Sequence, residues 1–404
     1  MKKNLLLLHL ESLNSLNYKM NPELFRTLKE IEQQCVVFEQ YYSTATSTLM
    51  VIGDLLYGGM NIYEGCASLD VVPKEYCYCT SLFDDLKEQG YHTGIYVYPD
   101  GGDLESGNAR HLVGFRHQME LKNCYSEYVN AFKRKMDNPP FALMACNFIS
   151  NLSINCHVDI HNYDTDYWEA GFRCMDQCCR DLLEILKEKK QMENTIIVLY
   201  GDHGDDYWGH GPHKGLTHAI EPNNLLIHTP LLVWDGIHRE APEHDFRLIQ
   251  TSDLREMIIK LLNGKNISRL PDRRYIISRN EYAAQPVREE SFNKAYSVTE
   301  GRYLLMVSGK GLEMYDTKKD PACQNNVLRF FVYKNGILIE NEENIDIFQF
   351  HFCGYWNSRE QRILRQKFYE LIKVLHEKTL ELYVAGGRNK DDMLQEMKFE
   401  QIVG

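Results

Sequence analysis

Short and almost uninterrupted apolar runs recur along the first two thirds of the chain. They lie at residues 5–10, 93–98, 141–148, 195–200 and 231–234. Runs of this length without alternation are typical of strands that are buried on both faces, as in parallel sheets. We therefore predict that these five segments form the strands of one buried sheet.

Between these runs the apolar residues recur with the period of amphipathic helices. The predicted helices cover residues 22–34, 49–56, 81–88 and 167–189, and Gly90 is placed to end the third of them. Strands that alternate with helices favour the α/β class, with a mostly parallel sheet that has helices on both faces.

The pattern changes after about residue 285. Short runs at residues 295–298, 303–308, 312–315 and 327–339 are typical of antiparallel hairpins with glycine at the turns. A long amphipathic helix is predicted over residues 358–383. We therefore predict a large α/β catalytic domain at residues 1–284 and a smaller C-terminal α+β subdomain at residues 285–404 that packs against it.

Composition narrows the classes of partner and compartment. The chain has 404 residues, 44% of them hydrophobic, and a net charge of −12, which disfavours nucleic acid as a partner. No apolar stretch approaches the ~20 residues of a membrane span, and the leucine run at residues 5–8 is too short for a signal peptide. A cytoplasmic location is therefore expected, and the composition leaves the oligomeric state open.

The cysteine pattern does not indicate a metal or disulfide framework. The chain has 12 cysteines at irregular positions, and no pair of CxxC motifs at zinc-finger spacing is present. Cys174 and Cys178 fall on a helical pattern, where cysteine behaves as a small hydrophobic residue. We expect reduced, structural thiols.

Two of the predicted strands are followed directly by metal-ligand residue types. Glu11 follows the first run, and Asp202 and His203 follow the run at residues 195–200. Ligand sites of open parallel sheets gather at the carboxyl ends of the strands. Residues 43–48 add hydroxyl groups at the expected start of a helix, where free backbone N–H groups stabilise an anion. Oxygen and imidazole donors together suit a divalent cation.

The hydroxyl-rich segment resembles the nucleophile region of sulfatases in the alkaline phosphatase superfamily. Tyr42 lies six positions before Thr48, and Leu55-Leu-Tyr-Gly58 follows it at the family's spacing. Sulfatases have Cys or Ser at the place of Thr48, followed by x-Pro-Ser-Arg, and convert it to formylglycine. Here Ile52 stands where that Arg would be, and threonine cannot become formylglycine.

Threonine as nucleophile is similar to the phosphoethanolamine and phosphoglycerol transferases. The stretch "LHLESL" at residues 8–13 resembles the first strand of the phosphoglycerol transferases, and residues 213–234 resemble the segment after the Asp-His pair of the phosphoethanolamine transferases. This resemblance covers most of residues 1–325. It implies framework roles for three further residues, which are Pro222, His228 and Pro230.

The resemblance also implies a mechanism. One divalent ion, with Mn²⁺ or Zn²⁺ favoured and Mg²⁺ or Ca²⁺ compatible, would be bound by four ligands, which are Glu11, Thr48, Asp202 and His203. Thr48 would attack the ester to give a covalent phospho-threonine. His213, His157 or Lys214 would protonate the leaving group, and water or an alcohol would then release the product.

Three functions remain open on the sequence alone. The first is a metal-dependent phosphodiesterase or phosphotransferase acting on a small-molecule or saccharide phosphoester. The second is a sulfatase that uses the unmodified threonine hydroxyl. The third is a binding module that has kept the fold without activity, although Glu11, Thr48, Asp202 and His203 all being present argues against it.

Overall fold

The protein is seen in a computed structural model that describes most of the chain. The described residues are 2–59, 80–98, 119–122, 124–147, 167–205, 221–265, 272–280, 295–308, 311–328, 331–334, 337–340, 357–385 and 390–396. All statements on structure below concern these residues.

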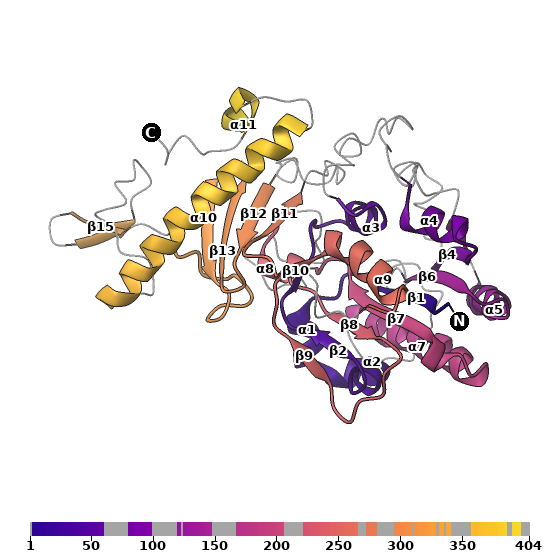
Figure 1. The fold of residues 1–404 in the computed structure, drawn as a ribbon. Coiled ribbons are helices and arrows are strands. Elements are labelled where there is room, and N and C mark those ends of the chain that lie inside the picture. The colour runs from indigo at the N-terminus through magenta and orange to yellow at the C-terminus, as the bar shows by residue number, and fades with distance from the viewer. Residues whose placement is uncertain are drawn as a thin grey trace.

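One large sheet forms the centre of the molecule (Figure 1). In the described part of the chain it has eight strands in the order β5-β4-β6-β1-β7-β8-β2-β9. They are β1 (Asn4–Leu10), β2 (Val36–Phe38), β4 (His92–Tyr98), β5 (Met119–Leu121), β6 (Phe141–Asn147), β7 (Thr195–Gly201), β8 (Leu231–Trp234) and β9 (Glu243–Asp245). All five strands predicted from the apolar runs are present, and the mostly parallel sheet is confirmed.

The central strands are parallel and in register at their carboxyl ends. β1 lies between β6 and β7, with Leu10 opposite Asn147 on one side and Gly201 on the other. β8 runs antiparallel to both of its neighbours, β7 and β2. The residues that follow β1 and β7 are thus delivered to the same edge of the sheet.

Helices cover both faces of this sheet, as its buried and mostly apolar central strands require. One face packs against α3 (Thr48–Tyr57), α4 (Leu82–Glu88) and α9 (Leu254–Leu262). The other packs against α1 (Ser15–Met20), α2 (Arg26–Glu32), α5 (Tyr125–Lys135) and α7 (Tyr167–Glu188). Alternate leucines of β1 enter the two cores, Leu5 and Leu7 on the first face and Leu6 and Leu8 on the second.

The predicted helix at residues 22–34 is interrupted. A 3₁₀ turn, η1 (Pro22–Leu24), is followed by α2, and Phe25 between them has φ −123° and ψ 46°. The Phe25 ring is fully buried and lies 5.3 Å from the Phe172 ring on α7, measured between centroids. Burial of this ring outweighs the local preference for one continuous helix.

A second, antiparallel sheet forms the C-terminal part of the molecule. Its order is β11 (Ile276–Asn280), β12 (Ala295–Thr299), β13 (Tyr303–Ser308) and β14 (Gly311–Asp316). The long helix α10 (Ser358–Ala385) crosses one face of this sheet, with α11 (Lys390–Glu396) beside it (Figure 1). The predicted antiparallel strands and terminal helix are confirmed, and β11 begins the small sheet ahead of residue 285.

The remaining elements are short. They are β3 (Tyr41–Tyr42), which pairs with β10 (Ile249–Gln250), the hairpin of β15 (Phe331–Lys334) and β16 (Ile337–Glu340), α8 (Asn224–Ile227), η7 (Met192–Asn194) and η8 (Thr251–Asp253).

The described cysteines are all free thiols. Cys174 and Cys178 lie on α7, and both are buried. No helix within the described ranges has the length and apolar character needed to cross a membrane.

Candidate functional site

The four predicted metal ligands lie near the edge of the large sheet where β1 and β7 end. Glu11 directly follows β1, Asp202 and His203 directly follow β7, and Thr48 is the first residue of α3. All four are buried, with at most 8% of each residue exposed. Charged and hydroxyl groups withdrawn from water in this way need partners, and Thr48, His203 and Asp202 contact one another in the sequence Thr48–His203–Asp202.

Asp202 is held through both of its carboxylate oxygens. Its Oδ1 accepts a hydrogen bond of 3.0 Å from the backbone N–H of Ser12. Its Oδ2 lies 3.0 Å from His9 Nε2 and 3.3 Å from His203 Nε2. Burial alone would raise the pKa of Asp202, but the two imidazoles and the backbone N–H of His203 lower that pKa below its usual value. The carboxylate is therefore kept ionised.

The backbone at Ser12 is shaped to reach this carboxylate. Ser12 has φ +59°, a left-handed conformation that non-glycine residues seldom adopt. This conformation turns its N–H toward Asp202 immediately after β1. The contact ties the ends of β1 and β7 together beyond their last ladder pair.

His203 is oriented by a hydrogen bond to its own neighbour. Its Nδ1 lies 2.8 Å from the carbonyl oxygen of Gly204, and since a carbonyl can only accept, Nδ1 carries the proton. Nε2, the other ring nitrogen, lies 3.0 Å from Thr48 Oγ1 and 3.3 Å from Asp202 Oδ2. Gly204 has to be glycine, because a Cβ there would lie 1.8 Å from the carbonyl oxygen of Leu225.

Thr48 lies at the amino end of a helix. Ser47 is the N-cap residue of α3, so Thr48 is its first helical residue, and Gly58 with φ +76° ends the helix. The first N–H groups of a helix lack intrahelical acceptors and carry partial positive charge. The Thr48 hydroxyl thus faces His203 next to helix N–H groups that are suited to bind a phosphate or sulfate oxygen.

Glu11 and Asp202 follow two neighbouring parallel strands, β1 and β7, directly after their last paired residues. Cys146 near the end of β6 is fully buried, and burial raises the pKa of its thiol, with a further increase from the charges of Asp202 and Glu11. Both carboxylates must therefore be near this thiol. This agrees with the register, which places Leu10 beside Asn147 and Gly201.

The donor groups match a divalent cation in kind. A metal-binding histidine typically donates its second ring N–H to a carbonyl or carboxylate, as His203 does to Gly204. The His203 imidazole lies in contact with both the Asp202 carboxylate and the Thr48 hydroxyl. Among the described residues, however, no three His, Cys, Asp or Glu side chains are arranged to hold a metal ion together. The four-ligand set stays a prediction.

Three of the predicted catalytic residues cannot be placed against this geometry. His157, His213 and Lys214 lie outside the described residues.

The sequence analysis did not identify three buried polar residues that support the site. His9 is fully buried inside β1 and contacts Asp202, and Asp54 and Arg279 form a fully buried ion pair behind Thr48. His9 and Asp54 are polar residues inside otherwise apolar runs, and that break in the pattern was the available signal, whereas Arg279 stands between Ser278 and Asn280 and gives no such signal.

The framework residue His228 has a defined place behind the site. Its ring stacks on Tyr42 at 4.8 Å between centroids, and its Nε2 donates a hydrogen bond of 3.0 Å to the carbonyl oxygen of Glu39. Burial lowers the pKa of His228 to about 4, and the nearby Lys19 adds to this effect. The ring is therefore neutral in the folded protein at neutral pH.

This shift predicts a loss of stability in mild acid. An unfolded histidine has a pKa of about 6.5, whereas folded His228 resists protonation down to about 4. The unfolded state thus binds an extra proton between these values, so stability should fall as pH drops from about 6.5 to about 4. Because the ring is partly exposed, we expect His228 to account for only about 1–2 kcal/mol of this loss. Urea unfolding of the parent and of His228→Gln at about pH 7 and about pH 5 measures how much free energy of unfolding each protein loses in acid. An equal loss in both proteins would contradict the prediction.

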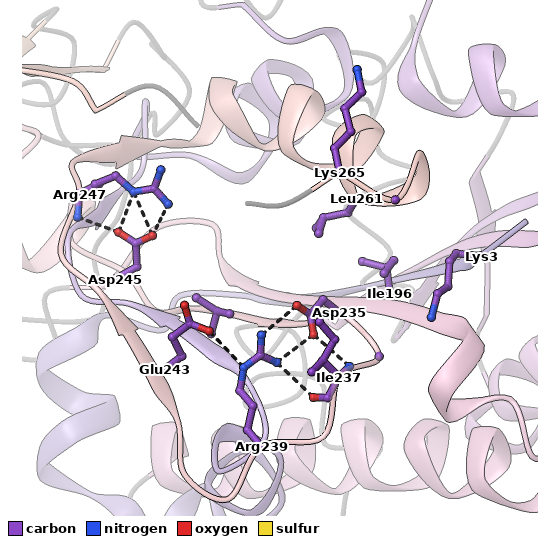
Figure 2. Close-up of a pocket in the computed structure, with 13 residues that line it drawn as sticks. Lys3, Ile196, Asp235, Ile237, Arg239, Glu243, Asp245, Arg247, Leu261 and Lys265 are labelled. Carbon is purple, nitrogen blue, oxygen red and sulfur yellow. Dashed lines mark hydrogen bonds and ion pairs between the residues drawn. The ribbon is translucent and has the colours of Figure 1, made fainter. Parts of the chain in front are cut away.

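A large cavity lies away from this site. It has a volume of about 740 Å³ and is lined by Lys3 before β1, Ile196 in β7 and the segment after β8. Figure 2 shows Arg239 paired with Asp235, and Arg247 paired with Asp245, along its wall. It thus lies at the amino ends of β1 and β7, at the edge opposite Thr48.

Comparisons with known proteins agree with this fold. The sulfatase family model matches residues 117–264, which include Asp202 and His203. No curated protein matched the sequence. Among solved structures, a putative sulfatase from Bacteroides thetaiotaomicron VPI-5482 superposes with a TM-score of 0.60 at 15% identity, covering 81% of this chain and 88% of that one.

Two further structures extend the comparison. BT1596, a 2-O GAG sulfatase, has a TM-score of 0.59 at 16% identity, covering 81% of this chain and 88% of its own. A protein in the alkaline phosphatase superfamily from Vibrio parahaemolyticus has a TM-score of 0.53 at 16% identity, covering 86% of this chain and 84% of its own. The chain therefore has the fold shared by sulfatases and the alkaline phosphatase superfamily, and with the family match over residues 117–264 this supports a sulfatase-like hydrolase or transferase.

Proposed function

We propose that the protein is a metal-dependent phosphodiesterase or phosphotransferase that reacts through a covalent phospho-threonine at Thr48. The observation that carries this proposal is the contact of 3.0 Å between Thr48 Oγ1 and His203 Nε2, at the amino end of α3. A hydroxyl is a weak nucleophile unless a neighbouring group accepts its proton or binds its oxygen. Here that neighbour is in place.

The bond changes in the proposed reaction balance over two steps. Thr48 Oγ releases its proton to solvent and attacks phosphorus, so that the Oγ–P bond forms while the bond to the leaving oxygen breaks. The leaving alkoxide takes a proton from His213, His157 or Lys214, the groups that the sequence proposes for this role. Water or an alcohol then attacks phosphorus and gives its proton to that same group, the Oγ–P bond breaks, and Thr48 Oγ takes a proton from solvent.

The described residues have distinct parts in this scheme. The N–H groups at the start of α3 face the non-bridging oxygens, which become more charged as the reaction proceeds. A divalent ion would be held by four residues, which are Glu11, Thr48, Asp202 and His203. When bound, it would favour the alkoxide form of the Thr48 hydroxyl. Ser12 and His9 keep the Asp202 carboxylate in place. The resemblance to the phosphoethanolamine and phosphoglycerol transferases adds that the acceptor would be a hydroxyl compound.

A second candidate is a sulfatase that uses the unmodified threonine. The family match over residues 117–264 and the printed names of the superposed structures favour it. Against it stands Thr48, which has no route to the formylglycine of true sulfatases. In either case the substrate would be a small-molecule or saccharide ester.

The two candidates predict opposite substrate preferences. We expect kcat/KM on bis-p-nitrophenyl phosphate to exceed that on p-nitrophenyl sulfate by at least ~100-fold, about 2.7 kcal/mol of transition-state binding. The reason is that water attack at phosphorus can resolve a phospho-threonine, whereas a sulfo-threonine lacks the second hydroxyl through which a formylglycine hydrate releases sulfate. Steady-state assays on metal-replete enzyme test this prediction. Similar kcat/KM values on both esters would contradict it and favour the sulfatase. A protein that neither retains a divalent ion nor turns over either ester would instead be a binding module.

A further inference from the structure

A fully buried ion pair connects the small sheet to the helix that begins with Thr48. Arg279 on β11 contacts Asp54 on α3 through two hydrogen bonds, Nη1 to Oδ2 at 2.8 Å and Nη2 to Oδ1 at 3.1 Å. Both side chains have no exposed surface. Such a two-pronged pair fixes the distance and orientation of the two groups, because the guanidinium and carboxylate are planar.

The same arginine also holds the loop that leads into the helix. The backbone N–H of Arg279 donates a hydrogen bond of 3.0 Å to the carbonyl oxygen of Thr44, and the Thr44 hydroxyl donates one of 2.5 Å to Asp54 Oδ2. The neighbouring Ser278 hydroxyl donates to the carbonyl oxygen of Ser43 at 2.5 Å. Loop, helix and small sheet are thus joined at one buried point, four residues before Thr48.

We propose that Arg279 is a positioning residue for Thr48. Its guanidinium and backbone fix Thr44 and Asp54, which flank the Thr48 hydroxyl on both sides along the chain, so the small sheet sets where that hydroxyl stands relative to His203. This inference rests on the proposed function, in which Thr48 is the nucleophile. In this proposal the C-terminal sheet supplies a residue that positions the nucleophile of the active site.

The energetics explain why a rigid connection would be used here. Burying two charges contributes little net stability compared with well-packed apolar groups, whereas loss of only one partner is strongly destabilising. A pair of this kind is retained where geometry matters, and displacement of a reacting group by about 1 Å costs about 100-fold in rate. Thr48 lies at such a position.

The test replaces the whole polar cluster by apolar groups of similar size. The variant Thr44→Val/Asp54→Leu/Arg279→Met replaces the three polar side chains that pair around the Asp54 carboxylate and leaves Ser278 with its partner, the Ser43 carbonyl oxygen. We expect it to fold, to bind Mn²⁺ with an affinity within about 3-fold of the parent, and to lose about 10–100-fold in kcat with little change in KM. Circular dichroism, calorimetric titration with Mn²⁺ and bis-p-nitrophenyl phosphate assays give these readouts.

A matched ion pair at the opposite edge of the sheet provides the control. Arg239 contacts Asp235 through two hydrogen bonds of 2.8 and 2.9 Å on the wall of the cavity in Figure 2. Asp235→Leu/Arg239→Met should leave kcat within about 2-fold of the parent, because this pair touches nothing near Thr48.

A more conservative variant keeps the proposal testable if the triple variant does not fold. Arg279→Lys retains the charge next to Asp54 but cannot contact both carboxylate oxygens as the guanidinium does. We expect it to fold and to lose about 3–10-fold in kcat at unchanged KM. A folded triple variant or Arg279→Lys with the parent's kcat would overturn the proposal. Failure of the proposed function is distinguishable, since Thr48→Ala would then retain activity.

Discussion

Thr48→Ala should lower turnover of a phosphodiester by at least ~1,000-fold, while the protein remains folded. The variant removes the nucleophile and with it the covalent route. Its structural cost is small, because it loses one hydrogen bond to His203 at the first position of α3, worth about 1 kcal/mol. Steady-state assays and thermal unfolding on the same preparation separate these two effects.

The neighbouring hydroxyls provide the control for this prediction. Thr46 and Ser47 are also buried at the start of α3. Thr46→Ala and Ser47→Ala should retain activity within about 10-fold of the parent. If Thr48→Ala stayed active while one of these variants lost turnover, the nucleophile would be a different hydroxyl of the same segment.

Asp202→Asn should weaken binding of a divalent ion by at least ~100-fold and reduce activity in parallel. The substitution keeps the size of the side chain and an acceptor for the Ser12 N–H, but it removes the charge that lies between His9 and His203. Calorimetric titration with Mn²⁺ and with Zn²⁺ measures the loss directly. Added metal should not restore the parent rate.

A second aspartate serves as the control for this charge. Asp235 is also largely buried and paired, but it lies at the amino ends of the parallel strands, beside the cavity in Figure 2. Asp235→Asn should bind Mn²⁺ like the parent. Tight metal binding by Asp202→Asn would remove Asp202 from the ligand set.

Several parts of the fold were predictable because local pattern and tertiary environment agree. The run at residues 5–10 predicted β1, and burial on both faces explains why leucine fills nearly every position. The start of α3 was predicted to within one residue, because Ser47 and Thr48 are favourable at a helix start and Gly58 at its end. By contrast, Phe25 divides the predicted helix at residues 22–34, because its ring packs against a helix far along the chain.

The candidate site was predictable in part for a related reason. Glu11, Asp202 and His203 follow buried strands, and parallel strands deliver such residues to one edge. The supporting groups were not predictable in this way. His9 and Arg279 act through contacts with residues about 190 and 225 positions away, Asp202 and Asp54 respectively. The sequence shows only that His9 interrupts an apolar run, it does not single out Arg279, and the structure identifies both partners.

The most direct test of the central claim is to identify the residue that carries the covalent intermediate. Enzyme mixed with bis-p-nitrophenyl phosphate, quenched in acid during the first turnover and digested, is examined by tandem mass spectrometry of the peptide that contains residues 43–58. We predict a nitrophenyl-phosphoryl group on Thr48, absent from Thr48→Ala and formed with a stoichiometric burst of nitrophenolate. A burst with the adduct on another residue, or full turnover with no adduct on Thr48 at any quench time, would contradict the account.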